Sequence, residues 1–440
     1  MDEDNFIKLE AIDVVANRIV VYKFNYSGDS HRYLLSKSFY VKYDRPLENV
    51  SMDILSIPFV SGLASVAWVT GTNIYLDALD EEYLASLKEV METLNRFYPK
   101  IGFRGGVIVD DAVSNRFRNG GIGQLFSGGL DSTTLYIQNM EYKPILFTVF
   151  GAVIPVSNRA VIGKVRESHS KFARWEGVTI DFIETNVREV INEPLLTAEY
   201  GKYLRNYDRT WWEGVNHGLI LLSLCAPLTV DDVSVMRLAS SIPTNPHGSH
   251  PYLTSKIRWG DVRVIPGGYE FERQDKVKLL LKPYITKYGY HPRLQLCNYA
   301  PVVSDQLNCG SCEKCSRNIL SLLVEGIDPR RCGFPIIRGF YKHIKEEIAP
   351  EITYKSWKHI VEEIEEIKYY TLNSEEFISW LKDYEFARNE GNHLREKSFE
   401  WLLLHIYSHL PRTTQNKILN VLYQHKYIKK GEEIKYPALK

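Results

Sequence analysis

The sequence lacks net charge, because its 440 residues include 54 lysines and arginines and 54 aspartates and glutamates. No global field therefore draws the protein to nucleic acid or to an anionic membrane, although neutrality leaves room for local patches. It also lacks a run of about 18 apolar residues, the length that a membrane-spanning helix needs. The acidic start Met1-Asp-Glu-Asp4 has neither the basic nor the apolar segment of a signal peptide. We therefore expect a cytoplasmic protein with no membrane partner, and nucleic acid is not indicated as a ligand.

Cysteine is absent from the first half of the chain, since the first one is Cys225. The N-terminal region is therefore not a glutaminase of the type that uses an N-terminal cysteine nucleophile. Cys225 lies in an apolar segment and Cys332 stands alone, so both are predicted to be packing thiols.

The other four cysteines form a compact pattern, C-x11-C-x2-C-x2-C, made by Cys297, Cys309, Cys312 and Cys315. In a reducing compartment such a cluster favours a metal over disulfides. Four thiolates fill the tetrahedral shell of Zn²⁺ and leave no position for water, so the pattern predicts a structural zinc site. A [4Fe–4S] cluster, which also takes four cysteines, is the alternative.

The most informative stretch is Ser127-Gly-Gly-Leu-Asp-Ser132, which we call the phosphate loop. An apolar strand (Leu125, Phe126) precedes it, and Ser132 opens a helix. Gly128 and Gly129 allow successive backbone N–H groups to converge on an anion, and the helix start adds further donors. No Gly-Lys-Ser/Thr follows, so this is not a Walker A loop. The alternative is a turn in which Asp131 and Ser132 serve only as caps.

Strands and helices alternate after the phosphate loop. Continuous apolar runs at 145–150, 178–183 and 233–238 are separated by helical segments at 160–173 and 217–224. This order predicts an α/β fold with a doubly wound parallel sheet. Ligands of such folds bind beyond the carboxyl ends of the strands, which is where the phosphate loop would lie.

The length suggests two or three domains. Residues 1–120 are predicted to form an N-terminal α+β domain, with alternating strands around Tyr22 and Val41 and a helix over 81–98. The glycine-rich segment 100–123 is interpreted as a linker or a loop crossing, with a boundary near residue 120. Residues 121–330 are predicted to form the central α/β domain and 331–440 a helical extension.

Three apolar stripes in that extension are predicted to be core or partner surface. They are Trp357, Ile360, Val361 and Ile364; Phe377, Trp380, Leu381 and Tyr384; and Phe399, Leu402, Leu403 and Ile406.

Three further segments could complete a site around the phosphate loop. Asn216 and His217 open an apolar helix, where Asn216 is either a ligand of the nucleotide or an N-cap. The loop 239–251, which follows a predicted strand and holds His247, Ser249 and His250, is a candidate substrate loop or only a connection. Lys276 is predicted either to reach a phosphate from the start of a helix or to be a solvent-exposed charge.

The phosphate loop resembles the PP-loop of the ATP pyrophosphatases. Together with the four cysteines about 170 residues later, it makes residues 121–330 similar to QueC-type 7-cyano-7-deazaguanine synthases. The resemblance implies a PP-loop (HUP-like) fold and ATP, Mg²⁺ and Zn²⁺ as cofactors. It implies that Asp131, Ser132 and Lys276 are catalytic and that the cysteines hold zinc. It also implies that ATP is bound by Ser127, Gly128, Gly129, Leu130, Asp131, Ser132 and Asn216.

The chain departs from that family at two positions and in length. Pro246-His-Gly-Ser-His-Pro251 replaces the family's Asp-Tyr-Ser-Gly-Tyr-Pro-Asp-Cys-Arg substrate stretch, and Val215 rather than arginine precedes Asn216. About 120 residues precede the central domain and about 110 follow it. In these respects the chain resembles the long QueC-like proteins of bacterial anti-phage operons, the Qat systems and a CBASS type.

The resemblance implies a ligase that adenylates the carboxylate of a 7-deazaguanine-type nucleobase and releases AMP and pyrophosphate. An amide or nitrile forms next, with operon-encoded proteins expected to dock on the terminal extensions. The alternatives are an ATP-binding structural subunit of a defence complex, a stand-alone synthase of queuosine biosynthesis and a tRNA-modifying enzyme. The neutral charge disfavours the last.

Overall fold

The computed structural model of the chain describes residues 5–117, 120–204, 210–230, 232–240, 245–297, 306–349, 354–364 and 374–384. The third predicted apolar stripe, Phe399 to Ile406, lies outside these residues. None of the described helices combines the length and the apolar character that crossing a bilayer requires.

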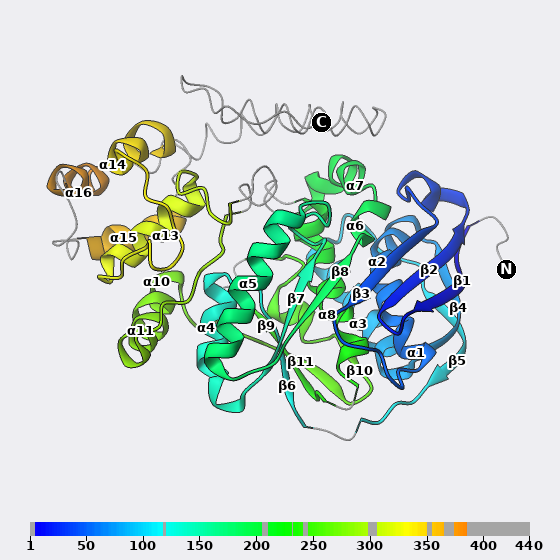
Figure 1. Cartoon of the computed structure of the whole chain (residues 1–440). Helices are drawn as coiled ribbons and strands as arrows, with labels where there is room; N and C mark the ends of the chain where they lie inside the picture. Colours follow the sequence, from blue (N-terminus) through cyan, green and yellow to red (C-terminus); the bar gives the residue numbers. More distant parts are fainter. Residues whose placement is uncertain are drawn as a thin grey trace, which may run out of the picture.

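The described residues form one large, mostly parallel sheet of 11 strands with helices on both faces (Figure 1), which confirms the predicted α/β class. Its order is β10-β11-β9-β6-β7-β8-β3-β2-β1-β4-β5. The strands are β1 (Phe6–Val15), β2 (Ile19–Tyr26), β3 (Ser38–Tyr43), β4 (Asn73–Asp80), β5 (Val107–Val113), β6 (Ile122–Leu125), β7 (Ile145–Phe150), β8 (Ile180–Thr185), β9 (Val235–Ala239), β10 (Arg258–Trp259) and β11 (Val262–Gly267).

The helices connect and cover this sheet. They are α1 (Met52–Leu55), α2 (Ile57–Thr70), α3 (Glu81–Phe97), α4 (Leu130–Asn139), α5 (Arg159–Glu176), α6 (Val187–Val190), α7 (Glu193–Tyr200), α8 (His217–Ser223), α9 (Pro251–Thr254), α10 (Arg273–Asp275), α11 (Lys282–Tyr288), α13 (Glu313–Val324), α14 (Phe340–His343), α15 (Tyr354–Glu363) and α16 (Ser374–Lys382). Two π-helical turns, Trp212–Asn216 and Lys276–Leu281, run directly into α8 and α11.

The parallel half of the sheet, β11-β9-β6-β7-β8, is the predicted central unit. Its order places β6 in the middle, so the phosphate loop emerges from the centre of the sheet. Phe126 and Leu146 pack there against Tyr136 of α4 and Phe172 of α5. Burial on both faces explains why these strands are continuous apolar runs.

The N-terminal unit continues the same sheet. Strand β3 pairs antiparallel with β8, with Val41 opposite Thr185 and Tyr43 opposite Ile183. The predicted alternation is confirmed, because Val20, Tyr22 and Phe24 of β2 are all buried. One hydrophobic cluster contains residues of both units, so residues 1–120 and the central unit share a core. The boundary near residue 120 stays a prediction.

The interpretation of 100–123 as a linker is wrong for its middle part. Residues Val107–Val113 form β5, which pairs in parallel with β4 at the edge of the sheet. Glycines precede this strand, and Gly105 has a φ of +89° and lies tightly against the carbonyl of Thr72. Gly105 therefore allows the tight turn that leads into the edge strand β5.

The described part of the helical extension belongs to a second core around α13. Trp357, Ile360 and Ile364 are buried there with the cysteines, as are Phe377 and Leu381 of α16. The indole N–H of Trp357 donates to Glu313 of α13 over 2.8 Å. Two of the three predicted stripes are therefore core rather than partner surface.

Candidate functional site

The phosphate loop occupies the predicted strand–loop–helix position between β6 and α4. Gly128 has a φ of +69°, and a Cβ there would lie 2.3 Å from Nε2 of His169, so both backbone angle and space require glycine. Gly129 is the N-cap of α4 and has no side chain to cap it, and among the described residues no side-chain hydrogen bond to the N–H groups of Leu130, Asp131 or Ser132 is found. Ser132 Oγ lies 3.2 Å from Ser127 Oγ and donates to the Gly129 carbonyl over 3.1 Å. The backbone donors at the helix start are thus left for a ligand.

His169, which the sequence analysis did not identify, packs against this loop at Gly128. It is buried in α5, and its Nδ1 lies 3.0 Å from the hydroxyl of Thr148. Burial lowers the pKa of His169 to about 3, so its imidazole is neutral at physiological pH. A neutral ring against Gly128 fixes the loop without adding charge.

Asp131 at the start of α4 is held by two cations. Lys276 Nζ lies 2.6 Å from one carboxylate oxygen, and Arg273 lies 3.4 Å from the other. Burial alone would raise the pKa of Asp131, but Arg273 and Lys276 outweigh it and hold the pKa below its usual value. The Lys276 side chain is only 2% exposed and also donates to the Ser240 carbonyl over 3.2 Å. Lys276 is therefore not a solvated charge.

Two further cations on α13 approach the same carboxylate. Lys314 and Arg317 both interact electrostatically with Asp131, and burial followed by repulsion from Arg273 lowers the pKa of Lys314. Arg273 donates to Asn318 of α13 over 3.0 Å, which ties this helix to the phosphate loop. Two cations thus contact the carboxylate and two more interact with it electrostatically, and Arg317 also pairs with Glu313 over 3.2 Å. This gathering of positive side chains suits an oligophosphate.

Sequence reasoning missed Arg273, Lys314 and Arg317. Arg273 and Lys276 are three residues apart, as are Lys314 and Arg317, so each pair shares a helix face. That spacing is the signal that could have found them.

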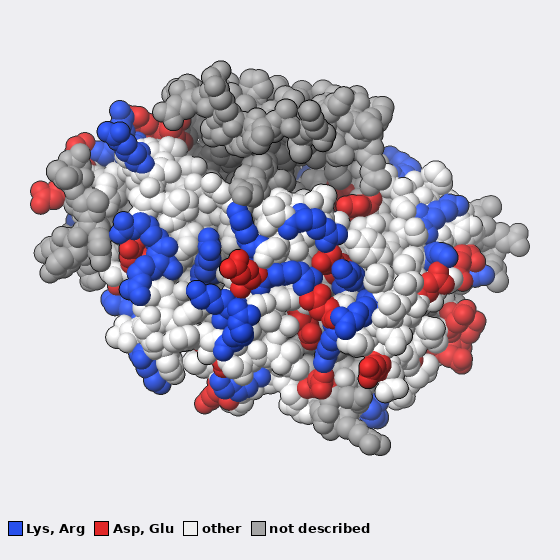
Figure 2. Space-filling view, viewed as in Figure 1, with Lys and Arg blue, Asp and Glu red and all other residues white. Residues whose placement is uncertain are grey.

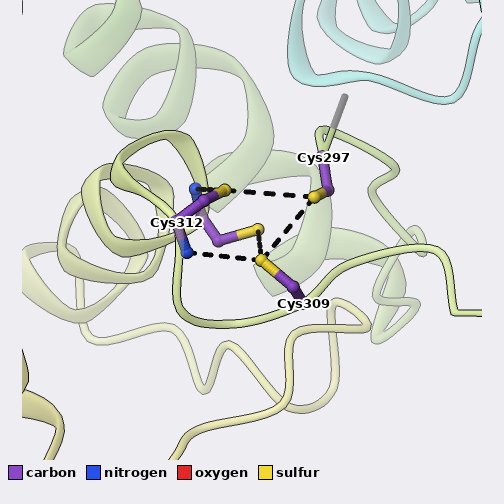
Figure 3. A group of neighbouring side chains, drawn as sticks. Cys297, Cys309 and Cys312 are labelled. Carbon is purple, nitrogen blue, oxygen red and sulfur yellow. Dashed lines mark hydrogen bonds between the residues drawn. The ribbon is translucent and has the colours of Figure 1, made fainter. Parts of the chain in front are cut away.

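The four predicted cysteines converge on one point (Figure 3). The sulfur of Cys297 lies 3.7 Å from that of Cys309 and 3.9 Å from that of Cys312, and the sulfurs of Cys309 and Cys315 are 3.8 Å apart. A tetrahedral ion with Zn–S bonds of about 2.3 Å separates its sulfurs by about 3.8 Å. The four thiols could therefore hold a metal ion such as zinc.

The local chain explains how the cysteines meet. Gly310 has a φ of +73° and lies against the Pro335 carbonyl, where a Cβ would come within 2.2 Å. The sulfur of Cys312 caps α13 by accepting from the Cys315 N–H over 3.4 Å. A metal here would fix the first turn of α13. This helix carries Lys314 and Arg317. Burial raises the pKa of Cys225, and that of Cys332 to about 12, as expected for packing thiols.

Asn216 and the loop 245–250 form a separate polar cluster. Nδ1 of His217 is hydrogen-bonded to the Ser249 hydroxyl, and the Ser249 N–H donates to Nδ1 of His247 over 3.2 Å. Burial, then Arg188, lowers the pKa of His217 to about 4. Asn216 is 1% exposed, caps nothing, and its Nδ2 has no partner among the described residues.

A chain of hydrogen bonds through Ser240 and Lys276 connects this polar cluster to the phosphate loop. The hydroxyl of Ser240 donates to the Ser249 carbonyl over 3.2 Å, and the carbonyl of Ser240 accepts from Lys276. Asn216 itself makes no hydrogen bond to the phosphate loop. The structure thus joins Lys276 directly to Asp131 of the phosphate loop, whereas Ser249 is linked to it through Ser240 and Lys276, and His217 through Ser249 as well.

In comparisons with known proteins, no family model, no curated sequence and no solved structure matches this chain.

Proposed function

We propose that the chain is an ATP pyrophosphatase of the PP-loop kind, which adenylates a carboxylate on a 7-deazaguanine-type nucleobase and passes it to an amine. The observation that carries the proposal is the phosphate loop, whose uncapped helix start lies beside Arg273, Lys276, Lys314 and Arg317. Backbone N–H groups and cations at one point favour a ligand with several phosphates.

The first step breaks the bond between the α-phosphorus and the oxygen that bridges to the β-phosphorus. An oxygen of the substrate carboxylate attacks the α-phosphorus, and pyrophosphate leaves with the bridging electron pair. We assign the leaving pyrophosphate to the loop N–H groups and to Lys276 and Arg273. Positioned charges of this kind stabilise the negative charge that develops in the transition state. Asp131 and Ser132 are the residues that would hold Mg²⁺, which would neutralise part of the phosphate charge.

The second step forms an amide. The lone pair of an amine attacks the acyl carbon, the carbon–oxygen bond to AMP breaks, and the amine loses a proton to solvent. No protein nucleophile is required. A second activation of the amide would give the nitrile.

We place the nucleobase against the polar cluster of Asn216, His217 and Ser249. Because an unpaired buried amide is costly, Nδ2 of Asn216 is suited to donate to a ring carbonyl of the substrate. With a pKa of about 4, His217 stays neutral and offers hydrogen bonds rather than charge. This cluster takes the place of the substrate stretch that the chain lacks.

Replacing Lys276 tests the cationic half of the site. We expect Lys276→Met to slow pyrophosphate release roughly 10²–10³-fold, because it removes a buried charge at the leaving group. Pyrophosphate release, measured with a coupled enzyme assay, checks this. The matched control is Lys278→Met, two residues on, where the lysine is 43% exposed and pairs with Glu363. Equal loss in both variants would contradict the assignment.

We propose that the amine belongs to a partner protein encoded beside this chain, in an anti-phage defence system, which docks on 1–120 or 331–440. The expected result is an added mass of one amide-linked deazaguanine on that partner after co-expression, and none with Asp131→Asn. Intact-mass spectrometry of the partner checks it. A free nitrile formed at the rate of compact synthases, with no mass added to any neighbour, would contradict the conjugate.

A further inference from the structure

A second cationic site lies near the phosphate loop and does not include Lys276. A cavity of about 720 Å³, within the roughly 300–1,000 Å³ of small-molecule sites, opens between α5 and the segments 290–293 and 330–335. We call it the basic cavity. Five cations line it: Lys164, Lys171, Arg293, Arg330 and Arg331. Figure 2 shows Lys and Arg side chains gathered on the face of the molecule that α5 crosses.

The positive charges of the basic cavity exceed its negative charges. Among the described residues, Glu167 is the one carboxylate in its lining, and Asp328 pairs with Arg330 over 2.9 Å. Lysine and arginine side chains thus outnumber carboxylates among the described residues of the lining. A concave surface lined mostly by one sign of charge focuses its field and attracts ions of the other sign. Nδ1 of His291, in the same lining, is buried without a hydrogen-bond partner among the described residues.

The basic cavity is close to the phosphate loop but separate from it. Lys164, Ser168 and Lys171 of α5 line the cavity, whereas the neighbouring His169 points to Gly128 and is buried. On the opposite wall, Arg293 lines the cavity, and two residues later the Gln295 N–H donates to the Gly128 carbonyl over 2.8 Å. His169 and Gln295 therefore separate the two anion sites.

Aromatic rings lie at the edge of the basic cavity. Tyr290 belongs to its lining and stacks on Trp175 of α5, with ring centroids 4.7 Å apart and planes inclined by 15°. The Trp175 side chain is exposed, at 53%. An exposed indole next to convergent cations is the combination that recognises a nucleotide, because the base stacks while the phosphates pair with Lys and Arg.

We propose that the basic cavity is a second nucleotide site, which binds a nucleoside triphosphate with its phosphates on Lys171, Arg293 and Arg331 and its base against the Trp175–Tyr290 stack. The convergence of Lys171, Arg293 and Arg331 and the single-nucleotide scale of the cavity favour one triphosphate over a long strand. This site is distinct from the phosphate loop and does not require the adenylation chemistry. Because the Gln295 N–H holds the Gly128 carbonyl, occupancy would also order the backbone next to the phosphate loop.

The test is equilibrium binding of N-methylanthraniloyl-GTP to the full chain, followed by fluorescence anisotropy. The cavity variant carries Lys171→Ala, Arg293→Ala and Arg331→Ala. The charge-matched control carries Lys8→Ala, Lys88→Ala and Lys100→Ala, three exposed lysines outside the cavity lining. We expect binding to the basic cavity to weaken about tenfold or more in the cavity variant and to remain in the control.

A phosphate-loop variant, Ser132→Ala with Lys276→Met, separates the two sites. It should retain the cavity-dependent binding, so a failure of the adenylation proposal does not affect this result. Inorganic tripolyphosphate should bind the wild type about tenfold more weakly than the nucleotide, because it has no base to stack, and Trp175→Phe should reduce that difference. Unchanged binding in the cavity variant, equal loss in the control, or tighter binding of a short oligothymidylate would overturn the proposal.

Discussion

Asp131→Asn is expected to abolish ATP-dependent formation of AMP and pyrophosphate, with a loss of at least roughly 10²–10³-fold. The substitution removes the carboxylate charge at the start of α4, where Lys276 and Arg273 hold the ionised form. Ser132→Ala should also abolish the activity, because it removes the hydroxyl beside Ser127. The measurement is chromatography of the products from ATP labelled at the α-phosphate.

The fold should survive Asp131→Asn. Asparagine keeps an acceptor oxygen for Lys276, which also donates to the Ser240 carbonyl. Circular dichroism checks this. The matched control is Asp110→Asn, which changes an exposed aspartate on the edge strand β5. If both variants lost activity to the same extent, or if Asp131→Asn retained full activity, the assignment of Asp131 would be wrong.

Cys309→Ser is expected to remove the metal and to lower the yield of folded protein. Structural zinc contributes about 10–16 kcal/mol of folding free energy in small zinc-binding peptides. In this chain the loss would release the capped start of α13 and, with it, Lys314, Arg317 and the Asn318 contact to Arg273. Elemental analysis should find one zinc per wild-type chain and less in the variant.

Cys332→Ala is the control, because Cys332 is buried yet stands outside the four-sulfur cluster. It should keep the zinc even if it melts at a lower temperature. An iron–sulfur absorbance band in anaerobically purified protein would mean that the metal assignment is wrong. So would a wild-type chain without any metal.

The parallel sheet and both motifs could be predicted because their signals are local. A buried strand is a continuous apolar run, as in Ile145–Phe150, and Ser127–Ser132 carries its loop geometry in six residues. Four cysteines at short spacing are typical of one metal site, and their sulfurs all lie within 4.8 Å of one another.

Other features depend on long-range contacts and could not be predicted in this way. The pairing of β3 with β8 joins residues about 140 positions apart, so nothing local indicates that the N-terminal unit extends the central sheet. The three-residue spacing of Arg273 with Lys276 and of Lys314 with Arg317 predicts a shared helix face, but that these side chains approach Asp131 depends on where α10 and α13 lie in the fold. The basic cavity draws its cations from α5, from 293 and from 330–331, which are also distant in sequence.

The most direct test of the central claim is the product pattern from ATP with 7-carboxy-7-deazaguanine and Mg²⁺. AMP and pyrophosphate should appear in equal amounts, only in the presence of the carboxylate substrate, and mass spectrometry should detect its adenylate when no amine is supplied. ADP and phosphate as the only products, or an ATP complex that releases no pyrophosphate, would contradict the account.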